Sequence, residues 1–488
     1  MPVSRRIKKG GLWACGAILF LLLLLWLSQR QFPTHPPAPA TSSAMDRIAA
    51  RWTGDLVETI EKRRFIRALV SYNQTNFFID RGTPRGIEYE LLKAYEAFLN
   101  RRHPSADGLK IKVVFTVLPF AELLPALREG RGDIAAAGLT VTDERRKQVA
   151  FTRPYFTEIS EVLVTHDALP AIESLEDLYG RTLHVLDGSS YIPHLQLLNQ
   201  SGKRRLRPTI HIVPVDPRLE EEDILQMVNA GIFEMTVADD HIARIWSEVL
   251  PDIRVWGDIA IHQGGEIAWA VRPDNPELLA DLNAFLATHR QGSLAFNLLV
   301  ARYYENTHWI RNPLSEPSRQ RFAQLMRLFR QYADQYDFDW LKIAALAYQE
   351  SGLDPNARSH RGAVGIMQVL PRTAAGPAID IPDIHDLENN IHAGVKYLAY
   401  LRDTYFDDPD LALEHRTDFA IAAYNAGPAR INRLRRRAAE QGLDPNRWFL
   451  NVEHVARQSI GSETVQYVSN VYIYYVAYRT AYELGKLG

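Results

Sequence analysis

The chain has 488 residues, about three times the length of an ordinary domain, so we expect two or three separate cores. Hydrophobic residues make up 46% of it and charged residues 23%, which excludes wholesale disorder. A formal net charge of -2 argues against a nucleic-acid binder driven by bulk positive charge. The single cysteine, Cys15, excludes a disulfide framework and any multi-cysteine zinc site.

Residues 1–30 carry the pattern of an export signal. Basic side chains at positions 5, 6, 8 and 9 precede an unbroken apolar run over residues 12–27. This run is shorter than the roughly 20 residues that span a bilayer, so a cleaved signal and a retained inner-membrane anchor both stay open. Because Cys15 lies at the start of the run rather than at its end, we expect no lipid anchor there. We predict an exported protein on the periplasmic side, peripheral to the outer membrane.

Residues 31–55 are predicted to form a linker, since the stretch PTHPPAPATSSA at 33–44 favours a stiff, extended tether. Beyond it, residues 56–308 alternate strand-like and helix-like segments. We predict strands at 67–72, 112–117, 133–138, 182–186 and 210–213, and helices at 88–99, 120–129, 223–230 and 276–290. This alternation predicts an α/β domain with mainly parallel, doubly wound sheets, which bind ligands at the carboxyl ends of their strands.

Three stretches of this region resemble the family-3 solute-binding proteins, the two-lobed periplasmic-binding-protein-like receptors for polar amino acids. They are GIEYELLKAYEAFL (86–99), LREGRGDIAAAGLTVTDERRKQVAFTRPY (127–155) and DGSSY (187–191). The resemblance implies that Arg145 holds the α-carboxylate of a ligand, a role that suits the planar, two-pronged guanidinium. It also implies ligand contacts from Thr140, Ser189, Ser190 and Asp239, with an aromatic wall from Tyr72 and Phe77.

Two of these residues have alternative interpretations that the sequence leaves open. Arg145 follows Asp143 and Glu144 directly and could be a solvated partner of either carboxylate. Asp239 stands before a helix-like stretch, where an N-cap is an equally good interpretation.

Residues 309–488 change character, because strand patterns stop and amphipathic helical patterns follow one another. We predict helices at 318–335, 340–350, 387–404, 417–425, 428–440 and 462–484. These patterns predict a separate all-α domain.

One glutamate of this domain stands where its pKa should be perturbed. Asp339 is a candidate N-cap for the helix at 340–350, and Gly352 and Pro355 end that helix. Glu350 therefore lies in the last turn, where the negative end of the helix dipole favours the protonated carboxyl. A carboxyl that is neutral near neutral pH suits a general acid. From these residues alone, an exposed glutamate without a function remains an equal alternative.

Three ordered stretches resemble the motifs of the soluble-type, goose-lysozyme-like lytic transglycosylases. They are AALAYQESGLDPNARSHRGAVGIMQVLPRTA (344–374), AIAAYNAGPARI (420–431) and ETVQYVSNVYIYY (463–475). The resemblance implies that Glu350 alone protonates the glycosidic oxygen between N-acetylmuramic acid and N-acetylglucosamine of peptidoglycan. As carboxylate it then removes the proton of the muramic C6 hydroxyl, which leaves a 1,6-anhydromuramoyl end without water. Resemblance to substrate-assisted glycosidases suggests that the 2-acetamido group stabilises the cationic centre in place of the second carboxylate that many glycosidases use.

Motif position also implies a set of substrate-binding residues: Ser351, Met367, Gln368, Tyr424, Asn425, Glu463 and Tyr467. We expect Ser351 to orient substrate or carboxylate, and Tyr424 to hydrogen-bond Glu350. Met367 offers apolar contact to a sugar face, with core filling as the alternative. Glu463 would line the cleft, with helix capping or ion pairing as its alternative.

Together these features predict a membrane-associated enzyme with two modules. The binding-protein-like module would sense an amino-acid or muropeptide effector and change the access of glycan strands by hinge closure. We predict no cofactor, no nucleic-acid partner and no metal, since the 15 histidines form no H-E-x-x-H or similar cluster. The competing hypothesis is a periplasmic sensor whose helical domain holds peptidoglycan without cutting it. The intact Gln349-Glu350-Ser351 triplet argues against that hypothesis, because a pure binder needs no acid there.

Overall fold

The computed structural model describes residues 51–80, 83–104, 110–204, 206–304, 313–483, 485 and 487. All of them belong to one compact unit, Ala49–Gly488. The predicted export signal, most of the predicted linker and the predicted boundary between residues 308 and 309 lie outside the described residues. Among the helices described, none has the length and apolar character needed to cross a bilayer.

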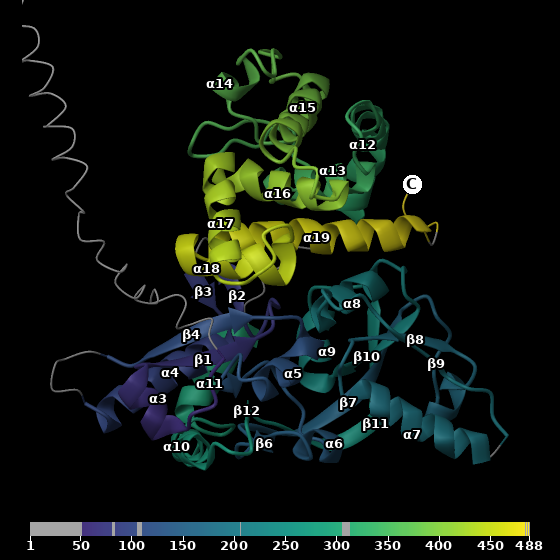
Figure 1. Cartoon of the computed structure of the whole chain (residues 1–488). Helices are drawn as coiled ribbons and strands as arrows, with labels where there is room; N and C mark the ends of the chain where they lie inside the picture. Colours follow the sequence, from purple (N-terminus) through teal and green to yellow (C-terminus); the bar gives the residue numbers. More distant parts are fainter. Residues whose placement is uncertain are drawn as a thin grey trace, which may run out of the picture. The chain divides into compact units, whose positions relative to one another are not determined.

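The first lobe is built on a mixed five-stranded sheet with the order β4-β1-β5-β12-β6 (Figure 1). β1 (Phe65–Val70) pairs in parallel with β4 (Lys112–Val117) and with β5 (Ile134–Ala135). β12 (Ala270–Val271) runs antiparallel to β5 and to β6 (Ala150–Phe151). The short β2 (Phe78–Asp80) and β3 (Thr83–Arg85) form a separate hairpin. Helices α3 (Leu56–Lys62), α4 (Ile87–Arg102), α5 (Leu123–Arg128), α10 (Pro276–Leu286) and α11 (Leu294–Tyr304) belong to this part.

The second lobe has an antiparallel sheet in which β7 (Phe156–His166) lies between β10 (Met235–Asp239) and β11 (Ile253–Ile267). β8 (Thr182–Val185) and β9 (His211–Pro214) pair in parallel beside it. Its helices are α7 (Tyr191–Arg204), α8 (Glu221–Asn229) and α9 (Asp240–Ser247). The prediction of mainly parallel sheets is wrong for β7, β10 and β11. β11 contains glycines and several register shifts, which hide the alternation that marks a strand.

The C-terminal module is helical, as predicted. It contains α12 (Glu316–Gln335), α13 (Trp340–Ser351), α14 (Pro371–Ala374), α15 (Leu387–Tyr405), α16 (Leu413–Ala426), α17 (Pro428–Glu440), α18 (Glu453–Ile460) and α19 (Ser462–Glu483). A π-helical turn, Trp448–Val452, precedes α18. Every residue of α13 from Leu341 to Tyr348 is buried, mainly against α19 and α12. This packing fixes the position of the C-terminal end of α13.

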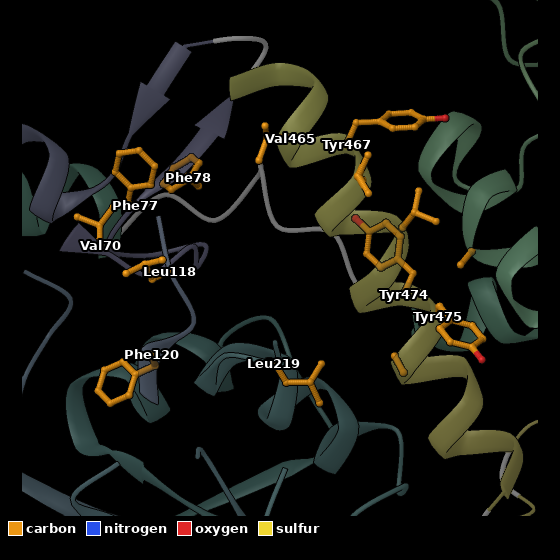
Figure 2. Packing of buried hydrophobic residues seen from close by; sticks show 14 of the residues in the cluster. Val70, Phe77, Phe78, Leu118, Phe120, Leu219, Val465, Tyr467, Tyr474 and Tyr475 are labelled. Atoms are coloured by element: carbon orange, nitrogen blue, oxygen red, sulfur yellow. The ribbon is translucent and has the colours of Figure 1, made fainter. Parts of the chain in front are cut away.

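Buried side chains of the helical module and of the first lobe belong to one hydrophobic cluster. Figure 2 shows Val465 and Tyr474 of α19 together with Phe77 and Leu118 of the binding-protein-like module. Polar contacts join the modules as well: Arg457 Nη1 donates to Val117 O at 2.9 Å, and Arg319 Nη1 to Ala230 O at 3.2 Å. The guanidinium of Arg218 lies 3.8 Å from the ring centroid of Tyr472.

Candidate active site and ligand cleft

Both ends of α13 are fixed by side chains or turns that the sequence predicts. Asp339 Oδ1 accepts a hydrogen bond from Leu341 N at 2.9 Å, which confirms the N-cap. Tyr475 Oη donates to the other oxygen, Asp339 Oδ2, at 2.7 Å. At the far end, Gly352 has φ +67° and its N–H donates to Tyr348 O at 2.8 Å. Glu350 thus lies in the last turn of a helix held at both ends.

Glu350 is partly exposed, and one side chain among the described residues donates a hydrogen bond to its carboxyl group. Tyr467 Oη, on α19, donates to Glu350 Oε1. Burial raises the pKa of Glu350 to about 7, and the Tyr467 hydrogen bond lowers it by a smaller amount. No carboxylate is among the causes of this shift. The carboxyl is therefore about half protonated at neutral pH. Desolvation on burial is the main cause of the raised pKa, rather than the helix dipole that the sequence suggested.

The two tyrosines of the later motifs exchange the roles that motif position suggested. Tyr424 does not bond Glu350; its hydroxyl donates to Met367 O at 2.8 Å. Tyr467, expected to be one of the substrate-binding residues, is the residue that bonds Glu350. Burial raises the pKa of Tyr424, and the charge of Glu350 raises it further. Tyr424 therefore still lies near the acid.

Ser351 ties α13 to the turn at residues 365–368, and Gln368 ties that turn to Ala357. Ser351 Oγ donates to Ile366 O at 2.8 Å and accepts from Asp354 N at 3.2 Å. Gln368 has φ +48°, and its Nε2 donates to Gly365 O at 2.8 Å and to Ala357 O at 3.1 Å. The Ser351 hydroxyl therefore binds backbone in this structure instead of orienting the carboxylate.

Met367 is fully buried, so the core-filling alternative describes it and the expected sugar contact does not. Its N–H donates to Asn390 Oδ1 at 2.9 Å. Asn390 Nδ2 donates to Val364 O at 3.0 Å and to Ile384 O at 2.9 Å. Asn390 thus holds the whole turn from within α15. Sequence reasoning missed it, because a single polar residue in an apolar helix stripe carries no motif.

The remaining motif residues bring the second and third motifs together. Asn425 Oδ1, at the end of α16, accepts a hydrogen bond from Thr464 Oγ1 at 2.8 Å. Glu463 is exposed in the first turn of α19, next to Thr464. Four elements thus meet around Glu350: α13, the 365–368 turn, α16 and α19.

A second candidate site is a cleft in the binding-protein-like module. The space between its side chains measures about 490 Å³, including the part that opens to solvent. Of the residues expected to bind ligand, Thr140, Ser189, Ser190 and Asp239 line it. The other lining residues include Asn73, Asn76, Phe120, Tyr191, Glu220, Glu221, Glu222 and His241.

Arg145 is buried beside this cleft and is not a solvated partner of Asp143 or Glu144. Its Nη1 donates to Thr140 O at 2.6 Å, and its Nη2 donates to Gly188 O at 2.9 Å. The guanidinium therefore fastens the two segments that carry the predicted ligand contacts.

The predicted aromatic wall is wrong in its members. Phe120 lines the cleft, whereas Tyr72 and Phe77 do not. Phe77 stacks on Phe115 with ring centroids 5.3 Å apart, inside the core of the first lobe. A loop phenylalanine cannot be assigned to core or cleft from spacing alone, which explains the error.

Asp239 directly precedes α9, but its side chain makes no capping hydrogen bond. Its Oδ1 is buried and lacks a hydrogen-bond partner among the described residues, as does Ser189 Oγ. Glu220, Glu221 and Glu222 form the start of α8, two residues before the predicted start at 223, and Glu220 forms a capping box with Asp223. Sequence reasoning did not foresee that the same three carboxyls line the cleft. Nor does any group of three His, Cys, Asp or Glu side chains suited to a metal occur in the described part of the chain.

Comparison with known proteins places these two sites in a family. Residues 66–303 match the model of bacterial extracellular solute-binding proteins, family 3, and residues 327–445 match the transglycosylase SLT domain. The membrane-bound lytic murein transglycosylase F of Desulfosudis oleivorans is 31% identical over 427 residues, covering 84% of this chain and 89% of the relative. The chain belongs to the membrane-bound lytic murein transglycosylase F family. The family member of Pseudomonas fluorescens strain Pf0-1 is 28% identical over 440 residues, covering 86% of this chain and 85% of its own.

Among solved structures, the chain is similar to an ancestral arginine-binding protein bound to arginine. The identity is 25%, with 50% of this chain and 99% of that one covered, at a TM-score of 0.41.

Proposed function

We propose that Glu350 is the single acid and base of a lytic transglycosylase. As a member of the lytic murein transglycosylases, the protein acts on the glycan strands of peptidoglycan. It cleaves the β-1,4 bond between N-acetylmuramic acid and N-acetylglucosamine without water. The observation that carries the role of Glu350 is its pKa of about 7, combined with its place among the three motifs.

In the first step, the protonated Glu350 donates its proton to the glycosidic oxygen as the bond from the muramic C1 to that oxygen breaks. A pKa close to the working pH supplies both enough acid form and enough driving force for proton transfer. In the second step, the Glu350 carboxylate takes the proton of the muramic C6 hydroxyl, whose oxygen bonds to C1. The enzyme returns to its protonated form, and the product carries a 1,6-anhydromuramoyl end.

The surroundings of Glu350 support one carboxylate in two roles. Glycoside hydrolases commonly place a second carboxylate within about 10 Å to act on water or on the sugar. Asp354, four residues beyond Glu350, instead accepts Asn356 N at 2.9 Å within the turn. Stabilisation of the cationic C1 therefore falls to the 2-acetamido group of the substrate. Tyr467 is a positioning residue, whose hydroxyl favours the carboxylate form of Glu350 after the first proton transfer.

Digestion of purified sacculi in water enriched in ¹⁸O, followed by mass spectrometry, tests this chemistry. The proposal expects anhydro ends without ¹⁸O. Reducing ends that carry ¹⁸O indicate a hydrolase, and the absence of released fragments indicates a peptidoglycan binder. Either of the last two results overturns the proposed reaction.

We further propose that the cleft binds an amino-acid or muropeptide effector that regulates cleavage. Arg145 would hold the ligand carboxylate, assisted by Thr140 and the serines of the 188–190 loop, and Asp239 would receive its ammonium. Because Arg145 donates to the backbone carbonyls of Thr140 and Gly188, binding a ligand carboxylate requires it to give up at least one of these hydrogen bonds.

One chain of contacts supports regulation through α19. Glu220 lines the cleft, and Arg218, two residues earlier, lies over the ring of Tyr472. Tyr472 and Tyr467 are on the same helix, and Tyr467 bonds Glu350. A ligand that shifts the start of α8 therefore acts on the helix that positions the acid. Regulation requires that the ligand favour one arrangement of this contact over another.

Calorimetry with amino acids and muropeptides, followed by turnover measurements at saturating ligand, tests the regulation. The change Arg218→Ala should leave ligand binding intact and abolish the ligand's effect on turnover. Arg254→Ala, which removes a similar contact with Trp256 in the same module, should leave the effect unchanged. The absence of binding heat, or a turnover rate indifferent to bound ligand, contradicts the proposal.

We also propose that the chain is exported and membrane-associated on the periplasmic side, peripheral to the outer membrane. Its apolar segment at residues 12–27 supports this location. Membrane fractionation of cells that express the full chain, beside a chain lacking residues 1–30, tests it. Recovery of the full chain in the cytoplasmic fraction contradicts it. The competing sensor hypothesis is not favoured, because the family consists of lytic murein transglycosylases and Glu350 is intact.

A further inference from the structure

The ligand cleft holds more carboxyl groups than one ligand ammonium can pair with. Glu220, Glu221, Glu222 and Asp239 all line it, and all four are buried or nearly so. Among the described lining residues none is a lysine or an arginine. A fifth carboxyl, Glu161, lies directly behind the lining, where its Oε1 accepts Ser190 Oγ at 2.6 Å.

The hydrogen bonds to the four lining carboxyls come from neutral groups. Glu221 Oε1 accepts Asp239 N at 2.8 Å, and Glu222 Oε1 accepts Thr75 Oγ1 at 2.6 Å. Burial raises the pKa of Glu220 and of Glu221 well above the ordinary value. The guanidinium of Arg145 lowers the pKa of Asp239, whereas no cation is among the causes of the raised pKa of the three glutamates. A buried carboxylate without a cation is costly, so burial favours the protonated form of these glutamates until a cation arrives.

Two further atoms point to a bound ligand independently of the acidic cluster. Asp239 is 5% exposed and Ser189 is 7% exposed, and both line the cleft. Asp239 Oδ1 and Ser189 Oγ have no hydrogen-bond partner within the described part of the chain. Buried polar atoms are normally paired, so these two atoms define a place where ligand groups bind.

We infer that the cleft takes a ligand with two cationic groups, of the basic or diamino-acid class. This inference rests on the proposed ligand-binding function and specifies its ligand. Asp239 receives the α-ammonium, and the three glutamates at the start of α8 receive the second cation. A ligand with a single ammonium would leave all three of these glutamates buried without a positive partner.

A matched pair of amino acids tests the inference by isothermal titration of the full chain. L-Lysine and L-norleucine have the same chain length, and only lysine carries a second ammonium. The inference expects lysine to bind at least about tenfold more tightly, the effect of one charge-assisted pair in a buried site. Equal affinities overturn the second cation site while leaving the proposed ligand-binding function standing. If neither amino acid binds, the inference fails, and calorimetry with muropeptides decides separately whether the proposed ligand-binding function also fails.

Substitutions locate the second cation. Glu221→Gln keeps an acceptor for Asp239 N and should reduce lysine affinity to that of norleucine, with norleucine affinity unchanged. Glu222→Gln provides the same test if the first variant does not fold, as judged by thermal unfolding. Asp239→Asn should weaken both ligands, and Glu234→Gln, at an exposed position of the same lobe, should weaken neither. A lysine preference that survives both glutamate changes overturns the assignment.

Discussion

Tyr467 on α19 donates a hydrogen bond to Glu350 Oε1 on α13, although 117 residues separate the two in sequence. A tyrosine of the third motif of the helical module thus positions the glutamate of the first motif. The hydrogen bond stabilises the charged carboxylate, while burial stabilises the protonated form, and burial has the larger effect. The balance between the two sets the pKa of about 7 on which the proposed mechanism depends.

This balance predicts the pH dependence of Tyr467→Phe. In the wild type, kcat/KM should fall as pH rises through about 7, because the free enzyme must carry a protonated Glu350. Removing a bond that favours the carboxylate raises the pKa of Glu350, so the falling limb should move upward by about 0.5 to 1 pH unit. Rates of fragment release across pH 5–9 measure the shift.

Tyr424→Phe is the matched control, because it removes a hydroxyl that bonds Met367 O and not the acid. Its falling limb should stay where the wild-type limb is. If the falling limb shifted for Tyr424→Phe and not for Tyr467→Phe, the result would contradict the hydrogen bond between Tyr467 and Glu350.

Glu350 should also cost the protein stability at neutral and alkaline pH. Its pKa is raised from 4.5 to about 7 in the folded state, so the folded protein binds more protons between these values. The free energy of unfolding therefore decreases as pH rises through that window, and the cost is complete above about pH 7. Glu350→Gln should stabilise the protein by on the order of 1 to 3 kcal/mol at pH 8 and by much less at pH 5. Thermal unfolding at both pH values measures this; an equal effect at both contradicts the raised pKa.

The turn at residues 365–368 should not tolerate a side chain at Gly365. This glycine has φ +76°, and an added Cβ would lie 2.3 Å from Asn390 Nδ2, the side chain that holds the turn. Gly362 has φ +81° but open space around it, so it isolates the cost of the backbone conformation. We expect Gly362→Ala to cost about 1 to 2 kcal/mol with activity retained, and Gly365→Ala to cost more and to lose most activity. Denaturant unfolding and rates of fragment release measure both; equal losses contradict a positioning role for Asn390.

Periodicity and capping signals predicted much of the fold. β4 and α17 have the predicted bounds, and α13 begins and ends where Asp339 and Gly352 indicate. Local signals do not reveal strand direction, so the antiparallel pairing of β7 with β10 and β11 was missed. α16 begins at Leu413, four residues earlier than predicted, because the polar start of the helix carries no apolar stripe.

The site was predictable where one helix carries the chemistry and unpredictable where several helices meet. The position of Glu350 in the last turn follows from α13 alone, whereas the burial that raises its pKa depends on the packing around that helix. Which of Tyr424 and Tyr467 reaches the acid depends on how α16 and α19 pack, which no local pattern encodes. The acidic residues at the start of α8 carry no ligand motif, and only the fold brings them to the cleft.

The most direct measurement compares peptidoglycan digests by the wild type, by Glu350→Gln and by Glu414→Gln, analysed side by side by mass spectrometry. Glu414 is exposed in the first turn of α16, at the end of that helix opposite Tyr424, and provides the same chemical change. Anhydro-ended fragments should be released by the wild type, be absent with Glu350→Gln in a folded protein, and persist with Glu414→Gln. Undiminished release of such fragments by folded Glu350→Gln would contradict the single acid–base mechanism.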